Sequence, residues 1–497
     1  MGRYLPRSID NILLAWKKES KHKPLLLRGA RQVGKSSAVK HLALEFDNYV
    51  EVNFEKQPQL KELFVGELDV KQIVAKLAVF FGVTIQPGKT LLFFDEIQMC
   101  KEAISSLRFF YEDYQELHVI AAGSLLEFVL NEIPTYGVGR IRSLFVYPMT
   151  FDEFLMATGN EKLIIEKKAA SASRPLMEVF HQKLVELFRI YLMVGGMPES
   201  VVTWVDEGDY LQCQQVQDEI IVSYEDDFAK YKKRVDTTLL RLTVRGVVHQ
   251  VGEKLMYSRI SRDYRSGQVK EALELLRLAG LIIPVVHTAA NGLPLGGECN
   301  VSFVKYLYFD SGLLLRILNM DLGDISKITE QLLVGGATDL VNKGFLTEMV
   351  AGLELLRYQS PTQRHDLYFW MRTEKNSMAE VDYLITRNLK ILPIEIKAGI
   401  KGGMKSLFNF MKDKNVEVGI RSWFLSDVIF WQKSRPGCWG RSGRRWCTRP
   451  PPCRRCRIHR WRRSALPPPS CRRGHPCGCG PGAAQTGRCL PGPGACP

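Results

Sequence analysis

Short apolar runs alternate with longer amphipathic stretches over residues 24–155. Apolar runs at 24–28, 90–94 and 118–122 and an alternating run at 49–54 predict strands, and stretches at about 34–46 and 101–114 predict helices. Strands that are covered on both faces are apolar throughout, which is typical of parallel sheets. Strand–helix alternation at this spacing predicts an α/β domain with a parallel sheet and right-handed crossovers.

The pattern changes after this region. Residues 156–235 are helical in pattern, with an interruption at 195–198, where the sequence Gly-Gly-Met-Pro disfavours a helix. Residues 236–325 contain a short helix at about 257–262, a turn at Gly267, a longer helix at 268–279 and two strands at 281–286 and 301–307. This order of helix, turn, helix and hairpin is that of a winged-helix domain.

The C-terminal part divides into an ordered region and a tail. A helix at 344–357 followed by strands at 367–371, 381–385 and 392–397 indicates a small α+β domain within residues 335–425. Residues 433–497 contain 12 of the 24 prolines and have no helical or strand period. Such a segment cannot bury a core, so we expect the tail to be disordered.

The net charge of +15 belongs to this tail. From Lys433 onward there are 15 Lys and Arg residues and no Asp or Glu, so residues 1–432 are neutral overall. The basic composition therefore does not indicate nucleic-acid binding by the folded part. Only three cysteines precede Cys438, which fits a reducing compartment. Without an apolar run of about 18 residues or a secretory signal, we expect a cytoplasmic protein and no membrane contact.

A Gly-rich loop joins the first strand to the first helix. It matches G-x-x-x-x-G-K-[ST], a phosphate-binding pattern in the strand–loop–helix context that supports it. Its glycines let backbone N–H groups point at phosphate oxygens, Lys35 reaches the β- and γ-phosphates, and Ser36 places its hydroxyl on Mg²⁺. We predict that ATP and Mg²⁺ bind through Gly29, Ala30, Arg31, Gln32, Val33, Gly34, Lys35, Ser36 and Ser37.

Two acids follow the strand at 90–94. We expect Asp95 to hold the Mg²⁺ shell and Glu96 to orient or deprotonate the attacking water; the alternative is a solvated acidic turn. Ser124 ends the next strand, where it can sense the γ-phosphate or cap a helix. Arg140 and Arg142 are candidates for a cation that stabilises transition-state charge in cis or in trans, or for surface ion pairs.

A second polar set lies in the C-terminal domain. Strand alternation places Glu395 and Lys397 on one face of a strand, with Asp382 on the strand beside it and Glu348 on the preceding helix. These residues could bind Mg²⁺ and activate water for phosphodiester cleavage. The alternative is a salt-bridged cluster that stabilises a small domain.

Two basic regions have ambiguous roles. Basic residues around the predicted recognition helix could contact DNA phosphates, although acids on the same helix oppose this and winged helices also bind proteins: Arg259, Arg262, Arg265 and Lys270, against Glu271 and Glu274. The tail contains poorly spaced zinc-ligand types and an arginine-rich tract that could bind nucleic acid: Cys453, Cys456, His459, Cys477 and Cys479. Its composition fits better a sequence read in a shifted frame from about residue 421.

The motifs, in chain order, resemble those of predicted bacterial AAA+-superfamily ATPases with an N-terminal AAA domain and a C-terminal domain of unknown function 4143. The resemblance covers roughly residues 1–420 and rests on residues 27–36, 93–98, 122–124, 138–140, 147–154, 195–199, 308–313, 380–382 and 394–397. It implies ATP binding and hydrolysis. It also implies a C-terminal region similar to the PD-(D/E)XK nuclease fold, with Glu348, Asp382, Glu395 and Lys397 as its site or the remnant of one.

We therefore expect an AAA-type P-loop ATPase domain at 1–155, a helical linker at 156–235, a winged-helix-like domain at 236–325, a PD-(D/E)XK-like domain at 335–425 and the tail at 433–497. One hypothesis is an ATP-driven switch that controls its C-terminal domain in contact with DNA. The other is a signalling or scaffold ATPase whose C-terminal domains bind a protein partner and cleave nothing. A homo-oligomer is an expected partner state for both.

Overall fold

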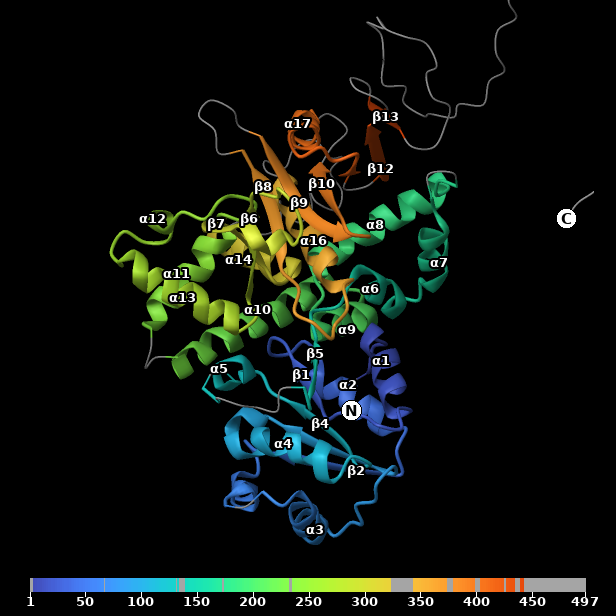
Figure 1. Ribbon diagram of the computed structural model, residues 1–497, viewed down its shortest axis with the longest axis vertical. Helices are drawn as coiled ribbons and strands as arrows, with labels where there is room; N and C mark the ends of the chain where they lie inside the picture. The colour runs from blue at the N-terminus through green and yellow to red at the C-terminus, as the bar shows by residue number, and fades with distance from the viewer. Residues whose placement is uncertain are drawn as a thin grey trace, which may run out of the picture. The chain divides into compact units, whose positions relative to one another are not determined.

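A computed structural model of the protein separates two compact units, residues 1–444 and residues 445–497. It describes residues 3–66, 68–130, 132–133, 139–171, 174–231, 235–322, 343–372, 379–397, 403–423, 426–433 and 439–441. All described residues belong to the first unit, which Figure 1 shows as ribbons. The candidate zinc ligands of the tail lie outside the described residues.

The first sheet has five parallel strands in the order β2-β3-β4-β1-β5, which confirms the predicted parallel α/β domain. The strands are β1 (Leu25–Arg28), β2 (Asn48–Asn53), β3 (Thr90–Asp95), β4 (His118–Ala122) and β5 (Arg142–Phe145). The hydrophobic pattern predicted four of them; it missed β5, which is four residues long and begins Arg-Ser. Because β4 pairs with both β1 and β3, the ends of these three strands meet at one edge of the sheet.

Helices cover both faces of this sheet. Leu27 and Phe93 face a core shared with α1 (Ser8–Lys17) and α2 (Lys35–Ala43). Leu26 and Phe94 face a second core formed with α3 (Val70–Phe81) and α4 (Lys101–Asp113). Both faces of each strand are therefore buried, as the uninterrupted apolar runs require.

A group of helices follows the first sheet. They are α6 (Phe151–Ala157), α7 (Glu161–Ala169), α8 (Glu178–Val194), α9 (Pro198–Glu207), α10 (Tyr210–Asp227) and α11 (Thr237–Val248). The short helix α5 (Leu126–Leu130) lies between β4 and β5, and the 3₁₀ turns are η1 (Pro58–Phe64), η2 (Ile97–Met99), η3 (Phe228–Tyr231) and η4 (Leu295–Glu298). The predicted interruption separates α8 from α9. Gly195 has a φ of 75°, and a Cβ there would lie 2.3 Å from Asp310 Oδ1, so only glycine fits the close approach.

The expected order of helix, turn, helix and hairpin is present in α12 (Tyr257–Ile260), α13 (Ser266–Leu278), β6 (Ile282–Thr288) and β7 (Cys299–Tyr308). However, β6 also pairs in parallel with β8 (Leu367–Met371). One mixed sheet, ordered β13-β12-β11-β10-β9-β8-β6-β7, therefore spans the ranges 236–325 and 335–425, which the sequence had divided into two domains.

The remaining strands of this sheet are β9 (Glu380–Arg387), β10 (Lys390–Lys397), β11 (Val418–Trp423), β12 (Ser426–Lys433) and β13 (Trp439–Arg441), and the helices are α14 (Ser311–Leu322), α16 (Lys343–Arg357) and α17 (Lys405–Asp413). α16 packs on β7 and β10, and α17 packs on β9 and β10. The PD-(D/E)XK character of this domain stays a prediction. Within the described ranges, no helix is both long enough and apolar enough to cross a membrane.

Candidate functional site

The Gly-rich loop lies between the end of β1 and the start of α2. Gly29 has a φ of 144°, and a Cβ there would lie 2.0 Å from the carbonyl oxygen of Val146. Gly34, with a φ of 93°, precedes the first residue of α2. Both conformations favour glycine, so the two glycines of the motif fix the path of the loop and its entry into the helix. Ser37 is exposed in the first turn of α2.

Lys35 is buried beneath this loop. Its Nζ donates hydrogen bonds to the carbonyl oxygens of Gly29, at 2.9 Å, and Ala30, at 2.6 Å. Burial lowers the pKa of Lys35 to about 8, and the nearby Glu96 and Asp95 carboxylates oppose this effect. The ammonium thus rests on neutral groups, and an anion bound in the loop would supply the charge that it lacks.

Asp95 ends β3 beside the loop, with its two oxygens on neutral donors. Ser36 Oγ donates to Oδ1 at 3.0 Å, and Asn53 Nδ2 from the end of β2 donates to Oδ2 at 3.1 Å. Burial and the adjacent Glu96 raise the pKa of Asp95. Hydroxyl and carboxylate oxygens are the ligands that Mg²⁺ prefers, and these two come from different elements that meet at one edge. Sequence reasoning missed Asn53, which register alone brings beside Asp95.

Glu96 lies at the same edge, with a left-handed φ of 49°. Its carboxylate accepts hydrogen bonds from Gln98 Nε2 and, at 3.3 Å, from Ser124 Oγ at the end of β4. Gln98 also packs tightly against Gly123, the residue after β4. A Cβ on Gly123 would lie only 2.0 Å from Gln98 Oε1. The structure therefore brings together Lys35, Ser36, Asp95, Glu96 and Ser124, and adds Gln98.

The candidate arginines lie elsewhere. Arg142 begins β5, where it pairs with Leu25 at the start of β1, and it donates to both oxygens of Glu19 at 2.7 and 2.9 Å. Arg140 precedes β5 and forms an ion pair with Glu112 near the end of α4. The loop follows the opposite end of β1, so neither arginine reaches it within the same chain. A role in trans stays a prediction.

Arg31, which lies inside the loop, is in contact with helix α10. Its Nη1 lies 2.8 Å from Asp227 at the end of α10, and Tyr224 Oη of the same helix donates to the Arg31 carbonyl oxygen. Gly280, which follows α13, approaches the backbone of Ala30 so closely that a Cβ would lie 3.3 Å from its nitrogen. The loop is therefore packed against the helices that follow it in sequence.

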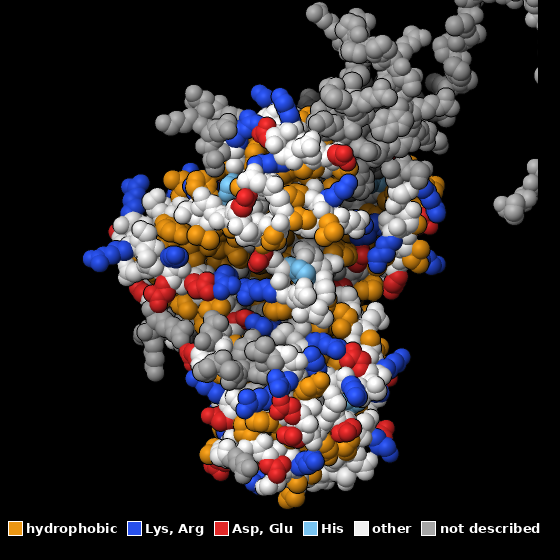
Figure 2. All heavy atoms as spheres, viewed as in Figure 1, with side chains coloured by type: hydrophobic (Ala, Val, Ile, Leu, Met, Phe, Trp, Pro, Cys, Tyr) orange, Lys and Arg blue, Asp and Glu red, His pale blue; other side chains and the backbone are white. Residues whose placement is uncertain are grey.

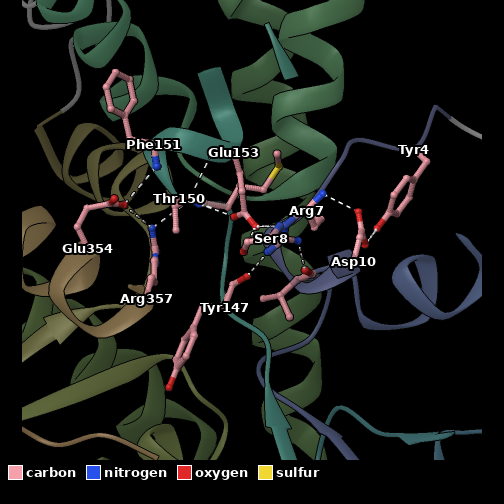
Figure 3. Close-up of polar contacts among 12 residues, drawn as sticks. Tyr4, Arg7, Ser8, Asp10, Tyr147, Thr150, Phe151, Glu153, Glu354 and Arg357 are labelled. Carbon is pink, nitrogen blue, oxygen red and sulfur yellow. Dashed lines mark hydrogen bonds and ion pairs between the residues drawn. The ribbon is translucent and has the colours of Figure 1, made fainter. Parts of the chain in front are cut away.

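A second anchor of the loop is Arg7, which the sequence did not single out. Figure 3 shows its guanidinium among groups from three parts of the chain. Nη1 donates to the Val33 carbonyl oxygen at 3.0 Å, Nη2 donates to the Tyr147 carbonyl oxygen at 2.8 Å, and Nε lies 3.2 Å from Glu153. Arg7 and Glu153 are both buried, so their pairing ties the loop to the start of α6.

The segment of residues 147–153, which Arg7 contacts from one side, is contacted by α16 from the other (Figure 3). Arg357 Nη1 donates to the Met149 carbonyl oxygen at 3.2 Å and to Tyr191 Oη at 2.8 Å. Glu354 Oε1, one turn earlier on α16, accepts from the Phe151 backbone N–H at 3.3 Å. Residues 147–153 thus form a polar bridge between the Gly-rich loop and a helix of the C-terminal domain, and we call this set of contacts the bridge.

The second predicted site is also on α16 and the mixed sheet. Asp382 directly precedes Tyr383 and Glu395 directly follows Ile394, two residues that are opposite each other in the antiparallel pairing of β9 and β10. Strand alternation places Glu380 on the face of Asp382 and Lys397 on the face of Glu395. Lys397 Nζ lies 2.5 Å from Glu395 Oε1, and the Ile396 backbone N–H donates to Asp382 at 2.7 Å. One carboxylate oxygen each of Glu348, Glu380 and Asp382 lies within 4.8 Å of the others.

Lys305 of β7 reaches this group from the hairpin. Its Nζ lies 2.8 Å from Glu348 Oε1 and also forms an ion pair with Glu380. Burial and neighbouring carboxylates raise the pKa of Glu348 to about 8, and burial with Asp382 raises that of Glu395 to about 7. Sequence reasoning assigned Glu380 no role in the site, although it belongs to the matched motif at 380–382. It did not point to Lys305, because Lys305 lies 43 residues before its partner Glu348 and in another predicted domain.

Two arginines of the winged-helix stretch form ion pairs with acids. Arg259 Nη1 lies 2.6 Å from Glu253, and Arg277 Nη2 lies 2.5 Å from Glu274 on the exposed face of α13. Lys270 and Glu271 share this face. Figure 2 shows Lys and Arg side chains interspersed with Asp and Glu on the visible face of the molecule. In this view, the described surface shows no continuous stripe of Lys and Arg of the kind that binds duplex DNA.

A loop after β1, an acid pair after β3 and a polar residue after the intervening β4 define the nucleotide site of a P-loop NTPase. Family models agree with this class: an AAA domain (AAA_14) matches residues 21–155, a domain of unknown function (DUF8612) matches 185–323 and a domain of unknown function (DUF4143) matches 343–422. The protein therefore has an N-terminal AAA domain and a C-terminal DUF4143 domain, which confirms the resemblance. An AAA domain implies binding of ATP and Mg²⁺.

Individual relatives are more distant. The uncharacterized protein MJ1637 of Methanocaldococcus jannaschii is 26% identical over 201 residues, which cover 39% of this chain and 41% of that protein. Among solved structures, the Walker-type ATPase PABY2304 of Pyrococcus abyssi is 16% identical with a TM-score of 0.42, covering 63% of this chain and 96% of that one. The ORC1 protein of Aeropyrum pernix, solved in complex with DNA, is 12% identical with a TM-score of 0.25, covering 63% and 91%.

Proposed function

We propose that the protein is an ATP-driven switch, in which the AAA domain binds and hydrolyses ATP and transmits its nucleotide state to the C-terminal domain. Lys35 and the loop N–H groups bind the phosphates, and Ser36 and Asp95 would hold Mg²⁺, which neutralises phosphate charge when bound. Glu96 orients or deprotonates the attacking water, and Ser124 and Gln98 position the Glu96 carboxylate.

The observation that carries the switch is the bridge. Arg7 contacts the Val33 carbonyl oxygen inside the loop and Glu153 at the start of α6. Arg357 and Glu354 contact residues 149–151 from α16. α16 also carries Glu348 of the carboxylate group, two turns earlier. A shift of the loop on phosphate binding would therefore act on the same helix that supports the second site.

Three full-length proteins test this function: wild type, Lys35→Ala and Glu96→Gln. We expect Lys35→Ala to lose ATP binding, and Glu96→Gln to bind ATP while its turnover falls by about 100-fold or more, as for removal of a group that acts mainly in the transition state. Hydrogen exchange in α16 should change with ATP in wild type and Glu96→Gln and stay unchanged in Lys35→Ala. Normal hydrolysis by both variants would contradict the nucleotide site.

The output of the switch is a separate question, which wild type and a further variant, Asp382→Ala, can answer. If the C-terminal domain acts on DNA, duplex DNA should raise ATP turnover, and Asp382→Ala should abolish metal-dependent nicking. The scaffold alternative predicts unchanged turnover and no nicking. The pairing of Lys305 with Glu348 and Glu380 favours the scaffold alternative for the conformation described above, because the carboxylates that a nuclease metal needs already hold a cation.

A further inference from the structure

The carboxylate group of the C-terminal domain is built around an ammonium. Lys305 is only 2% exposed, and its Nζ contacts Glu348 of α16 and Glu380 of β9. It also lies 5.2 Å from the centre of the Phe369 ring, which attracts cations. Three carboxylates thus have oxygens within 4.8 Å of one another, and two of them, Glu348 and Glu380, pair with one ammonium from a different part of the chain.

A fourth carboxylate has an unused ligand atom. Glu395 is 3% exposed, and its Oε2 has no hydrogen-bond partner among the described residues, whereas its Oε1 contacts Lys397. Glu395 directly follows Ile394 and Asp382 directly precedes Tyr383, the opposed pair of β10 and β9, and burial together with the charge of Asp382 raises the pKa of Glu395. A buried, unpaired carboxylate oxygen is costly unless a cation or donor approaches it. Together with the group of Glu348, Glu380 and Asp382, the last of which acts on Glu395, this atom indicates a site suited to a divalent cation with oxygen ligands.

We propose that Lys305 is an internal cation that occupies the divalent-metal position of this site, so that Mg²⁺ or Mn²⁺ enters only when Lys305 is withdrawn. This inference rests on the proposed function in so far as the C-terminal domain is the output of the switch. The ammonium supplies one charge where a divalent ion would supply two, and both would use the carboxylates of Glu348 and Glu380. Lys305 and the metal therefore exclude each other.

The segment that carries Lys305 is connected to the bridge by hydrogen bonds, so a movement of the bridge would act on Lys305. β7, which carries it, ends at Tyr308, and two residues later Asp310 accepts hydrogen bonds from the backbone N–H groups of Gly196 at 2.7 Å and Leu313 at 3.0 Å. Gly196 in turn accepts from the Met149 backbone N–H, within the bridge. The segment that holds Lys305 and the helix that holds Glu348 are thus both attached to residues 147–153, through different contacts.

The test is a calorimetric titration of nucleotide-free, full-length protein with Mn²⁺. We expect Lys305→Met and Lys305→Gln to gain a Mn²⁺ site that wild type lacks, and Lys305→Met/Glu348→Gln to lose it again. Lys390→Met is the matched control, because Lys390 lies on β10 and pairs on the surface with Glu417 at 3.8 Å. This control should titrate as wild type does.

A variant that is less stable still gives a result, since Mn²⁺ should raise the melting temperature of both Lys305 variants and leave wild type unchanged. The proposal is overturned if the Lys305 variants bind no more Mn²⁺ than wild type, or if wild type binds it equally well. Because the titration contains no nucleotide, its outcome does not depend on ATP hydrolysis. A gain of Mn²⁺ binding in a protein that fails the ATPase tests would leave this inference standing alone.

Discussion

The two candidate sites use the same residue types and treat their charges in opposite ways. At the Gly-rich loop, Lys35 rests on the carbonyl oxygens of Gly29 and Ala30, and Asp95 accepts from neutral donors. In the C-terminal domain, Lys305 pairs directly with Glu348 and Glu380. Among the described residues, Lys35 and Asp95 form no direct ion pair, although the Glu96 and Asp95 carboxylates lie near Lys35, whereas the carboxylate group pairs its ions with one another.

We call the Gly-rich loop the open site, because its buried ions have no direct ion-pair partner among the described residues, and the carboxylate group the closed site, because its ions pair with one another. Burying an ion is unfavourable unless a counter-charge or a set of hydrogen bonds approaches it. Burial lowers the pKa of Lys35 to about 8, so its charged form is disfavoured in the nucleotide-free protein and a bound phosphate would restore it. Carboxylates raise the pKa of Lys305 well above its ordinary range, so its charge is already satisfied. The partners of a lysine therefore indicate whether its site needs a ligand.

Removing each lysine should change stability in opposite directions. Lys35→Met should stabilise nucleotide-free protein by about 1 kcal/mol, because relief of a burial cost of about 3 kcal/mol outweighs two lost hydrogen bonds of about 1 kcal/mol each. Lys305→Met should destabilise it by about 3 kcal/mol, because buried carboxylates lose their counter-ion. Urea unfolding near neutral pH measures both. Destabilisation by both variants would remove the distinction between the sites.

The lowered pKa of Lys35 also predicts a pH dependence. Between the folded value of about 8 and the ordinary value of 10.5, unfolded protein binds the Lys35 proton and folded protein does not, so stability rises with pH in this window. The advantage of Lys35→Met over wild type should therefore be complete below about pH 8, vanish about one pH unit higher and reverse as the pH approaches 10.5, because the burial cost of about 3 kcal/mol disappears while the loss of the hydrogen bonds stays. Melting temperatures of the two proteins across this range measure it. A saturating ATP analogue should abolish the dependence, and a constant difference at all pH values would contradict it.

The sequence predicted the parts of each site that depend on local pattern. The loop, Asp95, Glu96 and Ser124 follow recognisable strands, and parallel pairing brings strand ends together without further information. Asn53 needed the register of β2 against β3, and Arg7 needed the fold of the N-terminal segment onto the loop. Neither is visible in a hydrophobic pattern.

The C-terminal site was predicted less completely, for a topological reason. Asp382, Glu395 and Lys397 were placed correctly on neighbouring strands because alternation is local. Lys305 comes from a hairpin that appeared to belong to a separate domain, and only the parallel pairing of β6 with β8 makes it a neighbour of Glu348. A contact that crosses an expected domain boundary has no local signal.

The smallest expected effect concerns Arg142, one of the two arginines considered as the cation that stabilises transition-state charge. Arg142 lies opposite Leu25 at the start of β1 and forms an ion pair with Glu19, whereas the loop follows the end of β1. Arg142→Ala should therefore change ATP turnover by less than about twofold and stability by less than about 1 kcal/mol, as for other partly exposed ion pairs. Steady-state hydrolysis and urea unfolding test this, with Arg3→Ala as the control for a more exposed pair, with Asp206. A loss of about 100-fold in turnover, the size expected for a group that stabilises transition-state charge, would instead show that Arg142 completes the site of a neighbouring copy. The loop would then be open not only to nucleotide but also to a second protein chain.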